Sequence, residues 1–112
     1  MLFRSRGTIE CDLTIGRLAD DRFKLVVGTA FGQRAAWWLN HHLADHDLVS
    51  IKDVTSAYAV INVIGPKSRE LLQTLTNADV SNEGFAFGTL KNFTIGNAPI
   101  MSFRVTYVGE LG

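Results

Sequence analysis

The segment Thr8-Ile9-Glu10-Cys11-Asp12-Leu13-Thr14-Ile15 alternates between polar and apolar side chains. A period of two is typical of a β-strand that buries one of its sides. We therefore expect a strand over residues 8–15. Its buried face would consist of Ile9, Cys11, Leu13 and Ile15, and its polar face of Thr8, Glu10, Asp12 and Thr14.

Asp12 is an unusual residue for the middle of a strand, because aspartate is depleted there. On the polar face it lies either in water or in a polar cavity, and general burial statistics favour the water-exposed face. Its neighbour Cys11 fits a small core side chain. No Cys or His follows at ligand spacing, so Cys11 does not indicate a metal site.

A hairpin and a helix are predicted to follow this strand. Asp20-Asp21 forms a turn, and Arg22 to Val27 alternates again as the antiparallel partner strand. After Thr29, a possible N-cap, apolar side chains recur at the spacing of an amphipathic helix. These side chains are Phe31, Ala35, Trp38, Leu39, His42 and Leu43.

The histidines at the end of this helix raise the question of a metal site. His42 and His46 are one helical turn apart, and His41 is adjacent, but no third ligand of clear geometry is nearby. Imidazoles also complement the negative end of a helix dipole. We interpret them as helix-end residues and predict no metal ligand.

The second half of the chain continues with strands and one more helix. Residues 48–54 are expected to form a short strand, and the apolar run 57–64 a central strand buried on both faces. Gly65-Pro66 then starts a helix over residues 67–75 with Leu71, Leu72 and Leu75 facing inward. The glycine-rich cradle of a phosphate loop is absent, so this is helix initiation and not an anion site.

A loop over residues 77–88 follows, with Phe85 and Phe87 predicted as core anchors. A final hairpin pairs residues 89–95 with residues 98–107 across Gly96-Asn97. The element order is then β-β-α-β-β-α-β-β. This order indicates an α+β fold, a mainly antiparallel sheet with two helices, and not a doubly wound parallel sheet.

The final hairpin leads into Tyr107-Val108-Gly109-Glu110, where Gly109 permits a turn. Tyr107 and Glu110 together offer a flat π-surface and a pair of acceptor oxygens, which suits a planar ring with two adjacent N–H donors. The spacing alone more often belongs to a core tyrosine and a water-exposed turn glutamate. Both interpretations stay open at this point.

Composition restricts the partners that the chain can have. The 112 residues carry eleven basic and eleven acidic side chains without a Lys/Arg run, which argues against nucleic acid. No apolar stretch approaches the roughly 20 residues that cross a bilayer, so we expect no membrane partner. A single cysteine is typical of a reducing compartment. We expect the cytoplasm, or the mitochondrial matrix if the source is eukaryotic.

Five segments, in order and at the right intervals, resemble the folate-binding domain of the glycine-cleavage T-protein (aminomethyltransferase) family. Within it they are most similar to the tetrahydrofolate module of FAD-dependent dimethylglycine and sarcosine dehydrogenases. The segments are Ile9–Thr14, Asp53–Thr55, Asn62–Arg69, Leu75–Ser81 and Arg104–Gly112.

The resemblance implies a tetrahydrofolate cofactor that accepts a one-carbon unit to give 5,10-methylenetetrahydrofolate. It implies that Glu110 accepts two hydrogen bonds from the pterin and that Tyr107 packs against the folate. It also implies that Asp12 lies near the reacting nitrogens as the catalytic carboxylate.

The resemblance further implies a parent protein larger than this chain, with residues 1–112 as a partial domain truncated at both ends. The chain has no dinucleotide fingerprint, so FAD would be bound by an upstream oxidoreductase domain outside it. The fragment alone is then expected to be inactive. The alternative is a non-catalytic regulatory module of the same fold. The identity of the amine substrate is left open.

Overall fold

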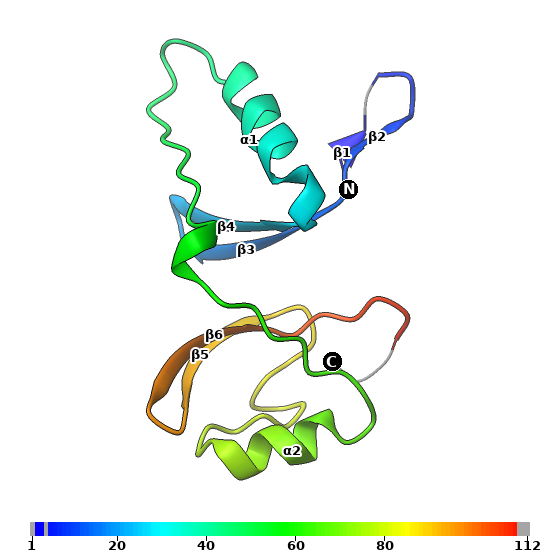
Figure 1. Ribbon diagram of the computed structural model, residues 1–112, viewed down its shortest axis with the longest axis vertical. Helices are drawn as coiled ribbons and strands as arrows, with labels where there is room; N and C mark the ends of the chain where they lie inside the picture. The colour runs from blue at the N-terminus through cyan, green and yellow to red at the C-terminus, as the bar shows by residue number, and fades with distance from the viewer. Residues whose placement is uncertain (1, 4, 110–112) are drawn as a thin grey trace. The chain divides into compact units, whose positions relative to one another are not determined.

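The computed structural model describes residues 2, 3 and 5–109, and it contains two compact units, Met1–Ala59 and Val60–Gly112 (Figure 1). Each unit combines antiparallel strands with one α-helix. The predicted α+β composition with two helices is therefore confirmed. Neither described helix has the length and apolar character that a membrane span requires.

The first unit contains two antiparallel strand pairs. Strand β1 (Leu2–Phe3) pairs with β2 (Ile9–Cys11), and β3 (Leu13–Ala19) pairs with β4 (Arg22–Val27). The register of the second pair places Leu13 opposite Val27. The predicted hairpin around Asp20-Asp21 is confirmed. The predicted strand over residues 8–15 is instead divided between β2 and β3, with Asp12 between them.

Helix α1 (Gly32–His41) follows a 3₁₀ turn, η1 (Thr29–Phe31). The predicted helix is confirmed, but the predicted cap is wrong, because Phe31 occupies the N-cap position without a side-chain hydrogen bond. The Phe31 amide donates to the Gly28 carbonyl over 2.8 Å. The 3₁₀ turn therefore gives the Phe31 amide a backbone acceptor, so no side-chain cap from Thr29 is needed for it.

The two strands predicted between residues 48 and 64 are wrong. In the described chain these residues form irregular backbone interrupted only by the 3₁₀ turn η2 (Thr55–Ala57). Val60 and Ile61 are 78% and 83% exposed, so this run is not a buried central strand. An apolar run becomes a strand only where neighbouring strands supply hydrogen-bond partners, and none of the three described strand pairs includes it.

The second unit contains helix α2 (Ser68–Leu75) and the hairpin of β5 (Leu90–Ile95) and β6 (Ala98–Phe103). The helix and the hairpin are confirmed. Leu71 and Leu75 are exposed, however, so the predicted inward face of α2 is wrong for both. Figure 1 shows α2 and the hairpin joined by the loop of residues 76–89.

The core of the second unit forms around that loop. Val80 and Phe85 are buried, and the Phe85 ring packs edge-to-face on Phe93 with centroids 6.2 Å apart. Phe85 is therefore a core anchor as predicted, whereas Phe87 is exposed and the same prediction is wrong for it. The Phe85 amide also donates to the Ser81 carbonyl over 2.9 Å, which fixes the backbone of the loop at this position.

Cationic side chains fasten this loop to the hairpin. The Lys91 ammonium donates to the Asp79 and Gly84 carbonyls over 2.9 and 2.8 Å. The Arg104 guanidinium donates to the Phe85 carbonyl and to the Asn82 amide oxygen. These contacts satisfy carbonyl groups that a loop packed near a core would otherwise leave without donors.

Gly84 is the glycine of the loop that has no room for a side chain. A Cβ atom there would lie 2.2 Å from Asp79 Cγ, well inside van der Waals contact. Moving Asp79 away would break the hydrogen bonds from the Ser81 side chain and amide, which also keep the pKa of Asp79 below its usual value. We expect Gly84→Ala to lower the free energy of unfolding of this unit by about 1–3 kcal/mol in a urea titration.

The control for this substitution is Gly32→Ala, where an added Cβ meets no atom within 4 Å. Gly32 begins helix α1 with helical dihedral angles, so alanine is expected to leave stability unchanged or raise it slightly. An unfolding midpoint of Gly84→Ala equal to that of the wild type would contradict the proposed packing.

Candidate functional site

Asp12 lines a cavity of about 410 Å³ in the first unit. This volume falls within the range of small-molecule sites. The cavity is enclosed by the segment that links β2 to β3, by the residues after β4 and by one side of α1. The lining residues are Ile9, Glu10, Cys11, Asp12, Leu13, Gly28, Phe31, Arg34, Ala35, Trp38 and Leu39.

The local backbone explains why Asp12 reaches this cavity. It occupies the single position between the end of β2 and the start of β3 and belongs to neither ladder. Its side chain is exposed. Aspartate is unfavourable inside a strand, but Asp12 lies between two strands and so avoids this cost. The residue that looked unusual in the sequence therefore lines a cavity in the structure.

Glu10 does not lie where the sequence pattern predicts. The alternation over residues 8–15 places it on the polar face, but its side chain is only 3% exposed, and Ile9 beside it is exposed instead. The assumed alternation fails because β2 and β3 pair with different strands and so do not share one face. The sequence signal for this burial is the presence of Glu10 among apolar residues in β2, together with Arg34 on the first helix that follows.

The buried Glu10 carboxylate is paired with Arg34 on α1. Arg34 Nη2 donates to Glu10 Oε1 over 2.5 Å, and the arginine side chain is 56% exposed. A buried carboxylate is costly unless a charge partner and hydrogen bonds compensate it. The ion pair therefore joins β2 to α1 across the cavity wall.

The remaining walls are mostly apolar, with one thiol among them. Cys11 is half-buried, and its thiol lies 3.8 Å from the Asp12 carbonyl as a weak donor. Trp38 stacks on His42 with centroids 4.0 Å apart, and His42 Nδ1 lies 2.7 Å from the Trp38 carbonyl. Apolar walls with a few charged groups are the usual composition of a site for an organic ligand.

Two of the three histidines stack on tryptophans. The ring planes of Trp37 and His41 are 8° apart, and those of Trp38 and His42 are 27° apart. Within residues 2, 3 and 5–109, no group of three or more metal-binding side chains comes together. The described cluster of rings is therefore an aromatic surface of α1.

Tyr107 lies in the second unit, after the end of β6. The predicted strand 98–107 is too long, since β6 ends at Phe103, and Tyr107 is 93% exposed, which excludes a core ring. The predicted glycine turn is confirmed: Gly109 has φ +86° and its amide donates to Thr106 Oγ1 over 2.8 Å. Glu110 lies outside the described residues.

Asp12 and Tyr107 thus belong to different units, and the structure describes each unit by itself. Asp12 comes together with Glu10, Cys11 and Arg34, three residues that the sequence interpretation did not assign to a site. A common site with Tyr107 and Glu110 stays a prediction.

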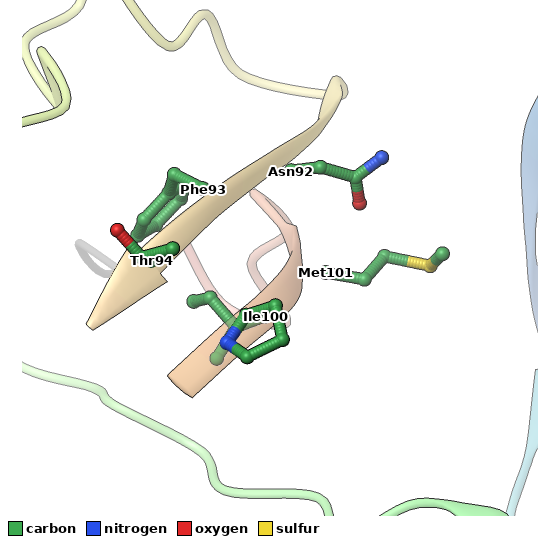
Figure 2. A pocket seen from close by; sticks show the side chains of 6 residues that line it. Asn92, Phe93, Thr94, Ile100 and Met101 are labelled. Atoms are coloured by element: carbon green, nitrogen blue, oxygen red, sulfur yellow. The ribbon is translucent and has the colours of Figure 1, made fainter. Parts of the chain in front are cut away.

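A second hollow lies on the β5–β6 hairpin, lined by Asn92, Phe93, Thr94, Pro99, Ile100 and Met101. Figure 2 shows Asn92 and Met101 on one side of the hairpin and Phe93 on the other, in agreement with the pairing of Asn92 with Met101. None of the lining side chains titrates or carries a charge. The Asp12 cavity is therefore the candidate site.

Comparison with known proteins points to one family. The sequence model of the GCVT N-terminal domain matches residues 1–112. The chain is 32% identical over 109 residues to mitochondrial dimethylglycine dehydrogenase of Mus musculus, covering 96% of the chain and 12% of that protein. It is 38% identical over 112 residues to 4-methylaminobutanoate oxidase (formaldehyde-forming) of Paenarthrobacter nicotinovorans, covering 100% and 14%.

A third relative is the aminomethyltransferase of Chlorobium luteolum, with 32% identity over 114 residues that cover 100% of the chain and 30% of that protein. The chain therefore spans between 12% and 30% of the length of these relatives. No solved structure matches the chain.

Proposed function

Because the chain belongs to the family of GCVT N-terminal domains, we propose that it is a tetrahydrofolate-binding module that accepts a one-carbon unit. The donor is a methylated or aminomethyl amine, and the product is 5,10-methylenetetrahydrofolate. The module works as part of a larger protein, an aminomethyltransferase or an FAD-dependent dehydrogenase of the dimethylglycine or sarcosine type. The observation that carries this proposal is the position of Asp12 in a ligand-sized cavity of a chain that matches the family throughout.

The residues of the cavity fit such a cofactor. Phe31 and Trp38 provide flat apolar walls for an aromatic ring system, and Asp12 provides an exposed carboxylate beside them. Tyr107, which is 93% exposed in the second unit, would pack against the folate, and Glu110 would accept the pair of pterin N–H donors. When bound, tetrahydrofolate supplies the nucleophilic nitrogens that take up the carbon unit.

The contribution of Asp12 follows from its charge and position. A carboxylate beside an amine orients it, stabilises the positive charge that develops on an iminium and can accept a proton from the attacking nitrogen. Asp12 is therefore the proposed catalytic residue.

The setting in the parent protein is part of the proposal. An oxidoreductase domain upstream would hold FAD and release the one-carbon unit, while a free aminomethyltransferase would take it from an aminomethyl carrier. The proposed compartment is the cytoplasm, or the mitochondrial matrix in a eukaryote. The names of the dimethylglycine and sarcosine dehydrogenases of Mus musculus include the word mitochondrial. Nucleic acid and membrane are not proposed as partners.

Calorimetric titration with tetrahydrofolate tests the proposal on the full-length parent protein. We expect saturable binding in the wild type and about 10–100-fold weaker binding in Glu110→Gln, because the amide keeps only one acceptor oxygen and no charge. Glu83→Gln is the matched control, since Glu83 is exposed in the loop of the second unit and is expected to leave affinity unchanged.

The same titration discriminates the alternative function, a non-catalytic regulatory module of the same fold. Such a module would give no heat and no saturation with tetrahydrofolate. Equal affinities of Glu110→Gln and the wild type would remove Glu110 from the proposed site while leaving the binding function in place.

A further inference from the structure

The carboxyl end of helix α1 leaves a backbone acceptor to a side chain. The His42 amide donates to the Leu39 carbonyl over 3.2 Å, as in a 3₁₀ turn, and not to the Trp38 carbonyl. The Trp38 carbonyl, one of the last four of the helix, therefore needs another donor. The His42 imidazole supplies it, because Nδ1 lies 2.7 Å from this oxygen. A carbonyl oxygen only accepts, so Nδ1 carries the hydrogen.

The same imidazole also contacts the Trp38 side chain. The two rings stack with centroids 4.0 Å apart and planes 27° apart. Stacked aromatic rings attract each other beyond the effect of the area that they bury. His42 therefore holds Trp38 at two points, the carbonyl and the ring, and both contacts restrict the rotamer of the indole.

This indole is part of the wall of the Asp12 cavity. Trp38 is half-buried and lines the cavity, whereas His42 contacts the indole without lining the cavity. We propose that His42 is a positioning residue, which holds the Trp38 indole as the wall on which the tetrahydrofolate ring stacks. This inference deepens the proposed function and rests on it for the identity of the ligand.

Helix α1 contains a matched pair one position earlier in the chain. Trp37 stacks on His41 with centroids 5.1 Å apart, but Trp37 is 61% exposed and does not line the cavity. Among the residues that the structure describes, His41 has no side-chain hydrogen bond. His41→Ala therefore removes the same kind of stack from the same helix outside the cavity and serves as the control.

Trp38 fluorescence measures the contact directly on the 112-residue chain. The background Trp37→Phe/His41→Gln leaves Trp38 as the single indole, and it removes the imidazole that lies edge-on to His42 with centroids 5.4 Å apart. Imidazole gains its positive charge between pH 8 and pH 5. Because a charged imidazole quenches an indole that it touches, we expect Trp38 emission to fall over this range. His42→Gln should abolish the change, and His46→Gln should keep it.

Tetrahydrofolate binding to the full-length parent protein tests the consequence for the site. We expect His42→Ala to raise the Kd about 2–10-fold and His41→Ala to leave it unchanged. In the transfer assay, the KM for tetrahydrofolate should rise in His42→Ala with kcat unchanged. The reason is that the wall contacts the cofactor equally in the ground state and in the transition state.

Two further variants separate the stack from the hydrogen bond. His42→Phe keeps an aromatic ring against the indole without a donor, and His42→Gln keeps a donor without the ring. Both are expected to bind tetrahydrofolate with affinities between those of the wild type and His42→Ala. Recovery of wild-type affinity by His42→Phe would assign the positioning to the stack alone and would support the inference.

Equal affinities of His42→Ala and the wild type would overturn the inference. So would an equal loss of affinity in His41→Ala, or a pH-dependent change of Trp38 emission that remains in His42→Gln. Failure of the proposed function gives a different result. A wild-type parent protein that does not bind tetrahydrofolate loses that function and the positioning role together, whereas one that binds it equally well with and without His42 loses the positioning role alone.

Discussion

Asp12→Asn in the full-length parent protein is expected to lower the rate of methylene transfer to tetrahydrofolate by about 10²–10⁴-fold. The substitution preserves the size of the side chain and removes its charge and its ability to accept a proton. Asp12 is exposed at a break between two strands, so the fold should tolerate the amide. The measurement is the amount of 5,10-methylenetetrahydrofolate formed for each amine consumed.

The ratio of 5,10-methylenetetrahydrofolate formed to amine consumed shows whether Asp12 acts in the transfer step. If the parent is a dehydrogenase, amine oxidation in the upstream domain should continue at the normal rate, and the carbon should be released as formaldehyde. Asp21→Asn, at the exposed turn of the β3–β4 hairpin and outside the cavity, is the matched control and should transfer normally. Transfer by Asp12→Asn at the wild-type rate would remove Asp12 from the mechanism.

Arg34→Met is expected to be the most destabilising single substitution in the cavity. It removes the Arg34 guanidinium from the Glu10 carboxylate, whose side chain is 3% exposed. Breaking a fully buried ion pair costs 3–5 kcal/mol. Since Arg34 is more than half exposed and water can replace part of its contribution, we expect a loss of about 2 kcal/mol.

A double-mutant cycle tests the origin of that loss. Glu10→Gln/Arg34→Met removes the buried carboxylate charge together with the Arg34 guanidinium, so it should recover part of the stability in urea titrations. Arg17→Met serves as the surface control, because Arg17 and Asp20 form an exposed ion pair in the same unit, where little is lost. A double variant that is no more stable than Arg34→Met would show that the ion pair is not responsible.

Local sequence patterns predicted the elements whose hydrogen bonds close within a short stretch of chain. The β3–β4 and β5–β6 hairpins join strands across tight turns, and α1 and α2 satisfy their own backbone. The hydrogen-bond partners in these elements are only a few residues apart, so a short stretch of sequence contains both partners. The same holds for the Gly109 turn, where a positive φ required glycine.

The patterns failed where partners are distant in sequence. The run 57–64 has the composition of a central strand, yet composition does not supply the flanking strands, and in the described chain it stays exposed and irregular. The face of Glu10 was misjudged for the same reason, because one continuous strand was assumed where two strands pair with different partners.

The sequence by itself therefore determined the family, the α+β composition and the candidacy of Asp12, since each depends on residue identities in order along the chain. Only the tertiary structure decided that Asp12 lines a cavity and that Glu10 is buried against Arg34, 24 positions away. The physical reason is desolvation: whether a carboxylate faces water or a cation depends on which element packs over it, and that packing is a property of the folded chain.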